Sequence, residues 1–312
     1  SRNVRKNGEI LKMEEIQFRR IELGDRDILH PYFQKFPSGS CERTFANVLL
    51  WSRHYPVTFA LIENTLVFRS TEEEPSFTYP IGEPEAVKHT LDILKSYTVE
   101  RKVPFVLYNV TKEQFEQLET WYPGRFEIEY QRDYADYVYE SEKLATLAGK
   151  KLHSKRNHIN KFKSTYENWS YETLSNDNLE ECFQMALKWR NDNKCDENED
   201  KNAEMCVTLN ALRLFEELEF VGGVLRIDGQ VVAFTIGEPL NEQTFVVHIE
   251  KAYAHIQGAY PMINQQFVAH ECLQYQYINR EDDTGSEGLR KAKLSYRPAF
   301  LVEKGIVKEK QQ

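Results

Sequence analysis

Two side chains on one predicted strand in the second half of this sequence could accept a proton during an acyl transfer. Attack by an amine or hydroxyl needs a base for the nucleophile's proton and an acid that protonates the leaving group. His248 and Glu250 lie two residues apart in the apolar segment Thr244 to Ala252, so a strand would place both on one face. Glu250 is the first candidate for the base and His248 the second. The alternatives are a solvated carboxylate and a hydrogen-bonded structural histidine.

A loop before a helix could bind the phosphates of a group donor. The segment HIQGAY places Gly258 just ahead of a helix whose first turn contains Pro261. Free N–H groups and the helix dipole make such a helix start an anion site. The expected contacts are Ala252, His255, Gln257, Gly258, Ala259 and Tyr260. A glycine in a plain turn is the alternative.

A basic segment reverses the sign of the local charge. The whole chain carries a net charge of -9, yet no acid occurs between Glu142 and Glu167. The second part of this interval, from residue 150 onward, carries six basic residues: Lys150, Lys151, Lys155, Arg156, Lys161 and Lys163. Such a cluster can neutralise the phosphates of tRNA, or the 3′-phosphate of CoA. We expect Lys151, Lys155 and Arg156 to contact a donor; a solvated helical face is the alternative.

A second charged segment combines acids with bases. Residues 281–283 are Glu-Asp-Asp, and they could bind a cationic acceptor or a metal, although a solvated loop is the favoured interpretation. Arg290 and Lys293 follow at helical spacing. They could hold phosphate, or they could offset the acids one turn earlier. We expect no bound metal.

Composition limits the class of protein. With 312 residues and 41% hydrophobic residues, the chain can fold as two domains with packed cores. No window is apolar over the roughly 18 residues of a membrane span, and no secretory signal precedes Met13. The five cysteines are widely spaced and odd in number, which predicts free thiols and a reducing, cytoplasmic location.

Hydrophobic periodicity predicts ten elements in the second half. A strand at 169–174 precedes a helix opened by a capping box at 177–180, then a second helix ending near Phe215. The Asp228-Gly229 turn joins two strands of a hairpin. A strand (244–252), a helix from Pro261, a strand (275–279), a helix (286–296) and a last strand (299–308) follow. In the first half, a hairpin (55–69), a helix (84–97), a strand of sequence VPFVLYNV and a helix (112–121) indicate a small α/β domain.

The order β-α-α-β-β-β-α-β-α-β resembles that of GNAT acyltransferases. Such domains splay two parallel strands, so that the donor's pantetheine pairs with exposed backbone. The resemblance implies that Tyr296 is the general acid, although a packing tyrosine is the alternative. It also implies that the phosphate loop departs from the usual pattern, since His255 replaces Gln or Arg and Tyr260 replaces a small residue.

Long segments resemble a more specific family. GKKLHSKRNHINKF (149–162), IEKAYAHIQGAY (249–260) and NREDDTGSEGLRKAKLSYRP (279–298) resemble the phosphatidylglycerol lysyltransferase C-terminal-like family, as does SGSCERTFANVLLWSRHY near the N-terminus. The resemblance implies an α/β (α+β) fold of tandem GNAT-like (acyl-CoA N-acyltransferase) domains with mixed central sheets, akin to Fem aminoacyl transferases. We therefore expect a flexible or expression-derived arm (1–13), a GNAT-like domain (14–140), a basic bridging helix (141–167) and a GNAT-like domain with the donor site (168–312).

The resulting hypothesis is a transferase. It would move an acyl group from acyl-CoA, or an aminoacyl group from aminoacyl-tRNA, to an amine or hydroxyl of a small molecule, lipid head group or peptide. Direct attack is expected, because no cysteine lies in a recognisable nucleophile setting. CoA would act as donor and not as a resident cofactor. The alternative is a non-catalytic CoA- or tRNA-binding module, and the first domain would be structural or would bind the acceptor.

Overall fold

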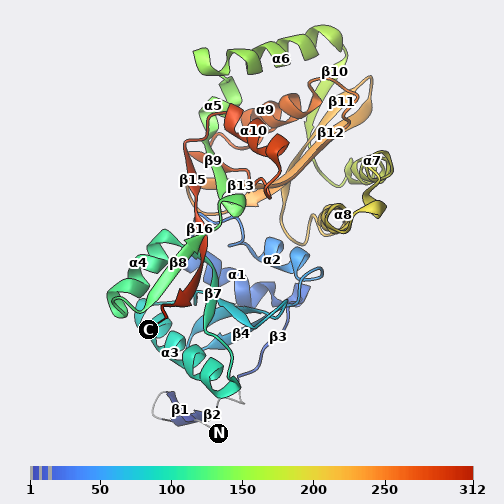
Figure 1. The fold of residues 1–312 in the computed structure, drawn as a ribbon. Helices are drawn as coiled ribbons and strands as arrows, with labels where there is room; N and C mark the ends of the chain where they lie inside the picture. Colours follow the sequence, from blue (N-terminus) through green and yellow to red (C-terminus); the bar gives the residue numbers. More distant parts are fainter. Residues whose placement is uncertain (1–2, 7–8, 13–15, 312) are drawn as a thin grey trace. The chain divides into compact units, whose positions relative to one another are not determined.

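A computed structural model of the chain describes residues 3–6, 9–12 and 16–311, which form two compact units (Figure 1). Residues 1–135 and 302–312 make up the first unit, and residues 136–301 make up the second. The expected arm at 1–13 contains an antiparallel hairpin of β1 (Asn3–Lys6) and β2 (Glu9–Lys12). The rest of that arm lies outside the described residues.

The second unit contains the ten expected elements in their expected order. They are β10 (Trp169–Thr173), α7 (Leu179–Asp192), α8 (Glu199–Arg213), β11 (Val221–Ile227), β12 (Gln230–Pro239), β13 (Thr244–Ala252), α9 (Ala259–Glu271), β14 (Tyr277–Asn279), α10 (Glu287–Ser295) and β15 (Phe300–Val302). The predicted capping box before α7 is wrong. Asn178 precedes the helix, but its side chain bonds the backbone of Ser175 and Thr173 behind it.

The segment expected to bridge the domains belongs to the second unit. It comprises α5 (Ser141–Thr146), a 3₁₀ turn (Lys150–Leu152) and α6 (His153–Thr165). Its apolar side chains are buried, with Leu144, Leu152, Ile159 and Phe162 each at most 4% exposed. These side chains pack in one cluster with Met262 and Phe267 of α9. The lysines therefore lie on a helix whose opposite face is fixed to the core.

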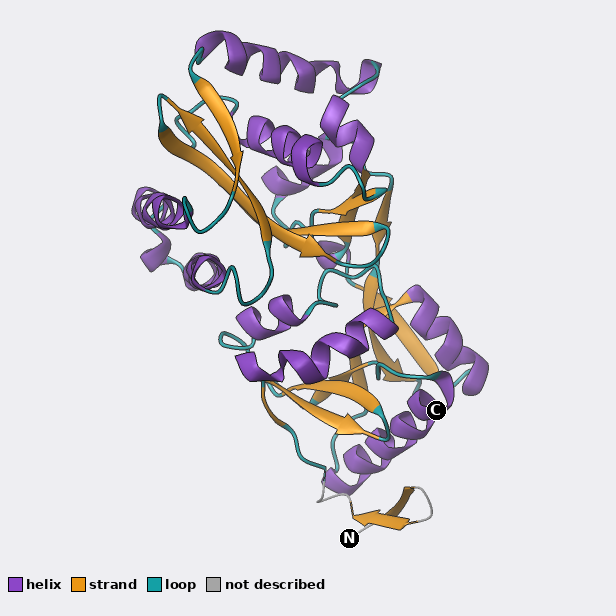
Figure 2. Cartoon of the chain, turned by 180° about the vertical axis from the view of Figure 1, so that it is seen from behind, coloured by secondary structure: helices purple, strands orange, loops and turns teal. Residues whose placement is uncertain are grey.

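The sheet of the second unit has the order β10-β11-β12-β13-β14-β9-β15. Strands β10 to β13 are antiparallel, β13 and β14 are parallel, and β9 (Asp136–Glu140) is antiparallel to β14. Helix α9 packs on one face, while α7 and α8 lie on the other (Figure 2). This is the mixed sheet and layering of a GNAT-like domain.

The first unit repeats that plan. Its sheet has the order β3-β4-β5-β6-β7-β16-β8, with β6 (Ser76–Thr78) and β7 (Val106–Thr111) parallel. The remaining strands are β3 (Arg19–Arg20), β4 (Val57–Ile62), β5 (Thr65–Ser70), β8 (Phe126–Tyr130) and β16 (Lys304–Glu309). The helices are α1 (Arg26–Lys35), α2 (Phe45–Trp51), α3 (Pro84–Arg101) and α4 (Lys112–Trp121). The fold is thus tandem GNAT-like.

The observed boundaries of the two units correct two expectations. The expected last strand is split, because β15 pairs in the second unit whereas β16 lies between β7 and β8 of the first. Residues 136–140, which we expected in the first domain, form β9 between β14 and β15. In each sheet, the second strand of the parallel pair, β7 or β14, therefore has an antiparallel neighbour from outside the stretch of sequence expected for that domain.

Among the described residues, no helix is both long and apolar enough to cross a membrane. All five cysteines are free, and four of them are buried, in agreement with the prediction of unpaired thiols.

Candidate active site at a fork between two strands

The parallel strands β13 and β14 separate after three pairs. Thr244, Phe245 and Val246 face Tyr277, Ile278 and Asn279, and β13 then continues for six residues to Ala252. We call the space beyond the Val246–Asn279 pair the fork. The parting of these strands, expected from the GNAT-like order, is present.

One edge of β13 in the fork lacks a strand partner. The N–H of Tyr253 donates to the oxygen of Val232 on β12, at 3.1 Å. Antiparallel ladders alternate, so the backbone groups of Ala252 and Glu250 point away from β12 and into the fork. These are the backbone groups that a donor could pair with.

Side chains bridge the fork where the backbone ladder stops. Oε2 of Glu250 accepts from Nη2 of Arg280 at 2.7 Å, and both side chains are about seven-eighths buried. Arg280 directly follows β14, and its Nε atom is buried without a hydrogen-bond partner among the described residues. Burial opposes the charge of Arg280, but the Glu250 carboxylate outweighs it and raises the pKa of the guanidinium. Glu250 is therefore an ordered carboxylate inside the fork.

His248 is held between two carboxylates. Its Nε2 lies 2.7 Å from Oε2 of Glu238 on β12, and its Nδ1 lies 2.7 Å from Oε2 of Glu281. The register of β12 and β13 shifts here, which leaves His248 as the extra residue of a bulge. Burial favours the neutral ring, but the two carboxylates outweigh it and raise the pKa of His248 to about 10. An imidazolium with both nitrogens engaged has no lone pair to accept a proton, so the geometry favours Glu250 over His248 as the base.

Tyr296 lies beside the same ion pair. Its side chain is almost completely buried at 9% exposure. Burial raises the pKa of Tyr296 to about 12, with Arg280 lowering it and Glu250 raising it further. The hydroxyl therefore stays protonated at neutral pH, as a proton donor must.

The basic helix α6 reaches this centre through one residue. Nζ of Lys155 lies 4.5 Å from the centre of the Tyr296 ring, and burial lowers the pKa of this lysine. The next residue, Arg156, instead donates to the backbone oxygens of Leu147 and Gly149, so it fixes the turn before α6. Lys151 is exposed in the 3₁₀ turn. Of the three predicted donor contacts on this segment, Lys155 lies at the fork.

The start of α9 offers fewer free N–H groups than expected. Gly258 is the N-cap residue with φ 84°, which suits glycine. The N–H of Ala259 already donates to the oxygen of Ile256 at 3.2 Å, and Pro261 has none. His255 and Gln257 are exposed, and the His255 ring stacks on Tyr253.

The acidic segment 281–283 is not the solvated loop that we expected. Asp283 is fully buried and accepts from Tyr137 at 2.5 Å and from Arg290 at 2.8 Å. Burial opposes its charge, but these hydrogen bonds lower the pKa of Asp283. Lys293 donates to the backbone oxygens of Arg280 and Asp282. Arg290 and Lys293 thus hold the segment beside the fork, which agrees with the alternative of charge compensation.

Two residues of the fork were missed by sequence reasoning. No pattern in the sequence pointed to Arg280, because its partner Glu250 is 30 residues away in sequence. Trp189 of α7 donates from Nε1 to the oxygen of Ala252 at 3.0 Å, and only the tertiary packing of α7 reveals that contact.

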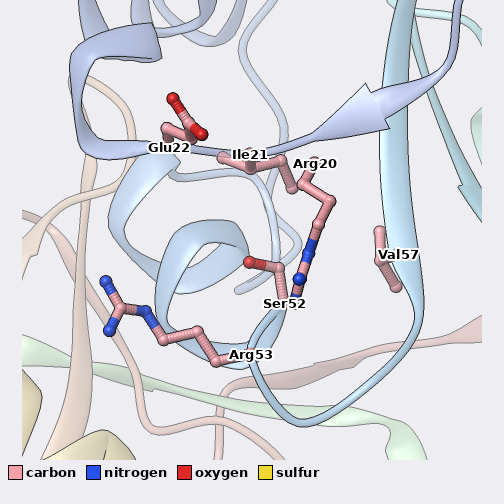
Figure 3. A pocket seen from close by; sticks show the side chains of 6 residues that line it. All are labelled: Arg20, Ile21, Glu22, Ser52, Arg53 and Val57. Carbon is pink, nitrogen blue, oxygen red and sulfur yellow. The ribbon is translucent and has the colours of Figure 1, made fainter.

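The first unit has a pocket of its own, of about 330 Å³. Figure 3 shows its lining side chains, with Arg20 extending toward Ser52 and Glu22 directed the other way. The remaining lining residues are Ile21, Arg53 and Val57. Its lining includes no base paired with a nucleophile, whereas the fork combines a carboxylate, a protonated phenol and a strand edge that no described strand pairs with. The fork is therefore the candidate active site.

Comparisons with known proteins agree with this architecture. A family model described as the C-terminal region of phosphatidylglycerol lysyltransferase matches residues 33–307. A solved protein of unknown function from Bacteroides thetaiotaomicron is 40% identical, with a TM-score of 0.88 over 95% of this chain and 100% of that one. L-PGS of Bacillus licheniformis is 15% identical, with a TM-score of 0.62 over 92% of this chain and 93% of that one, which shows a shared fold. An uncharacterised protein of Mycoplasmoides gallisepticum is 25% identical over 73% of each chain.

Proposed function

The chain belongs to the phosphatidylglycerol lysyltransferase C-terminal family, and from that premise we propose that it transfers an aminoacyl group from aminoacyl-tRNA to an amine or hydroxyl acceptor. The family membership confirms the resemblance expected from residues 149–162 and 279–298. The acceptor belongs to the class of small molecules, lipid head groups or peptides.

One contact, between Lys155 and the ring of Tyr296, supports aminoacyl-tRNA as the donor. Lys155 belongs to the basic helix and also covers the ring of Tyr296 in the fork. Exposed lysines at positions 150, 151, 161 and 163 extend the positive charge along the same helix and the turn before it. A phosphate backbone attracted to these lysines would bring its 3′ end toward the fork.

The chemistry of the leaving group also favours an aminoacyl ester. In aminoacyl-tRNA, the acceptor forms a new bond to the carbonyl carbon while the bond to the ribose oxygen breaks. A ribose alkoxide is a poor leaving group and needs a proton, which a phenol with a pKa of about 12 can supply. Only Oε2 of Glu250 is paired among the described residues, so Oε1 can accept the proton of the attacking amine or hydroxyl.

The test uses bulk tRNA charged with radiolabelled amino acids. We expect the protein to retain charged tRNA on a filter at low salt and to lose it at high salt, since phosphate contacts release counterions. Addition of a mixture of amine and hydroxyl acceptors should then release the label from tRNA into product. Absence of salt-sensitive retention would contradict this donor. Retention with no release would indicate the non-catalytic binding module.

Acyl transfer from CoA is the second candidate. The observation that favours it is the fork itself together with Gly258 at the start of α9, the arrangement in which a GNAT-like domain would hold a pantetheine thioester. Stabilisation of the wild-type protein by CoA in a thermal shift experiment would support it.

A further inference from the structure

We propose that Trp189 and Tyr260 close the free edge of β13 against pantetheine thioesters, and so select the donor at the fork. This inference rests on the proposed function, because it concerns the donor specificity of the same site. It assigns to two side chains a role that neither the fold nor the family membership specifies.

The first observation is an occupied carbonyl group. A pantetheine arm contains amides that add to an exposed strand edge through main-chain hydrogen bonds. At the end of β13, however, the oxygen of Ala252 already accepts from Nε1 of Trp189 at 3.0 Å. A thioester arm would have to displace an indole that is itself packed, since Nζ of Lys251 lies 4.3 Å from the Trp189 ring.

The second observation is the position of Tyr260. The side chain is 38% exposed as a whole, yet burial raises the pKa of Tyr260. The Ala252 backbone and the Trp189 side chain oppose that rise, which places the phenol beside both groups. Tyr260 therefore lies at Ala252 beside Trp189, whose indole occupies the carbonyl that a donor arm would use.

The third observation concerns the phosphates of CoA. A Cβ atom added to Gly258 would lie 3.3 Å from Cβ of Phe162 and 3.4 Å from the oxygen of His158, so α6 packs directly against the start of α9. Of the N–H groups at that start, Ala259 is engaged and Pro261 has none. The place where a pyrophosphate would sit is thus covered and poor in donors. An aminoacyl ester lacks an amide-rich arm of this kind, so the closed edge would not impede it.

The experiment measures CoA binding by calorimetry in four proteins. They are the wild type, the double variant Trp189→Phe/Tyr260→Phe, the double variant Trp189→Ala/Tyr260→Ala, and the control Tyr166→Phe. The phenylalanine pair removes both polar groups but keeps the rings, whereas the alanine pair also removes their volume. We expect no measurable binding to the wild type or control, and at least about tenfold tighter binding in the alanine pair, with the phenylalanine pair between them.

Two results would overturn the inference: CoA binding by the wild type, or no gain of binding in a folded variant. If the alanine pair does not fold, the phenylalanine pair decides alone. Retention of charged tRNA by the wild type is measured in parallel. If the wild type does not retain charged tRNA but the variants gain CoA binding, the proposed function is refuted and the closed edge is supported. If the wild type retains charged tRNA but no folded variant gains CoA binding, only the closed edge is refuted.

Discussion

At the scale of single residues, side chains continue the parallel ladder after its backbone pairs end. The last pair is Val246 with Asn279, and the same register continued by two residues would place His248 opposite Glu281; these two side chains form an ion pair. Glu250, two residues further along β13 than His248, pairs with Arg280, the residue before Glu281. Charged side chains, which are longer than a backbone hydrogen bond, thereby span the two strands while holding them apart.

Replacing His248 tests this bridge. We expect His248→Gln to lower the free energy of unfolding by about 3–5 kcal/mol near neutral pH, because the buried carboxylate of Glu238 and the partly buried carboxylate of Glu281 lose their partner. The folded-state pKa of about 10 lies above the ordinary value of 6.5. The contribution is therefore fully present below about pH 6.5 and is lost as pH rises through about 10. Urea unfolding of both proteins across this range measures it.

The matched control for that series is His255→Gln, since His255 is exposed in the loop before α9. Its effect should stay within about 0.5 kcal/mol at every pH. A difference between wild type and His248→Gln that does not shrink in alkaline solution would show that His248 is not a charged bridge.

Tyr296 supports a second residue-scale prediction, now about rate. If the hydroxyl protonates the leaving oxygen, Tyr296→Phe should lower the single-turnover transfer rate about 100-fold or more, while retention of charged tRNA changes little. Tyr166→Phe is the control, because this tyrosine packs on Phe162 of α6, away from Glu250 and Arg280. An unchanged rate in Tyr296→Phe would assign the tyrosine to packing.

At the scale of elements, the contact between α6 and α9 depends on one glycine. Gly258 has a φ of 84° and leaves only 3.3 Å between an added Cβ and Cβ of Phe162. We expect Gly258→Ala to cost about 1–2 kcal/mol in unfolding free energy, since a side chain is disfavoured in the left-handed region and the helices must separate.

Gly288→Ala is the comparison for that variant. Gly288 lies in α10, and an added Cβ would meet nothing within 4 Å. Alanine there should leave stability unchanged or raise it by up to about 1 kcal/mol, because alanine is the better helix former. Chemical denaturation measures both, and equal effects of the two substitutions would argue against close packing at Gly258.

Periodicity in the sequence predicted most elements, including the strand at 244–252 and the helix at 112–121, with the bounds found in the structure. These succeed because an apolar repeat reports which residues of a segment face a core. The same repeat does not say which sheet a strand joins. Val307 is fully buried in the first unit, yet its local pattern would suit either sheet.

The residues of the candidate site were also predicted only in part from the sequence. Glu250 was expected from the alternation of its strand and Tyr296 from the resemblance to GNAT domains, and the structure brings both to the fork. Burial of Asp283 did not follow, because three consecutive acids read as a solvated loop until Arg290 and Tyr137 are seen to enclose one of them. Pairings across long sequence separations decide which charged groups are buried, and a single sequence does not specify them.

At the scale of the whole molecule, the second unit is one continuous stretch of chain, whereas the first unit is built from two. The first unit needs β16, which lies between β7 and β8 and buries Val307 fully and Lys304 to 1% exposure. Lys304 also pairs with Glu42 at 2.6 Å, so a buried charge depends on the C-terminal strand. Removal of residues 303–312 would therefore take out the strand between β7 and β8 and leave β8 without a neighbour.

We expect deletion of residues 303–312 to unfold the first unit selectively. The second unit keeps all seven strands of its sheet without these residues, because β15 ends at Val302. Hydrogen exchange followed by mass spectrometry should show protection lost in β7 and β8 but retained in β11, β12 and β13. Deletion of residues 310–312 alone is the control, since it preserves β16 and should preserve protection in both units. Equal loss of protection in both sheets would mean that the units fold as one cooperative body, whereas retained protection in β7 would mean that the first sheet does not require its inserted strand.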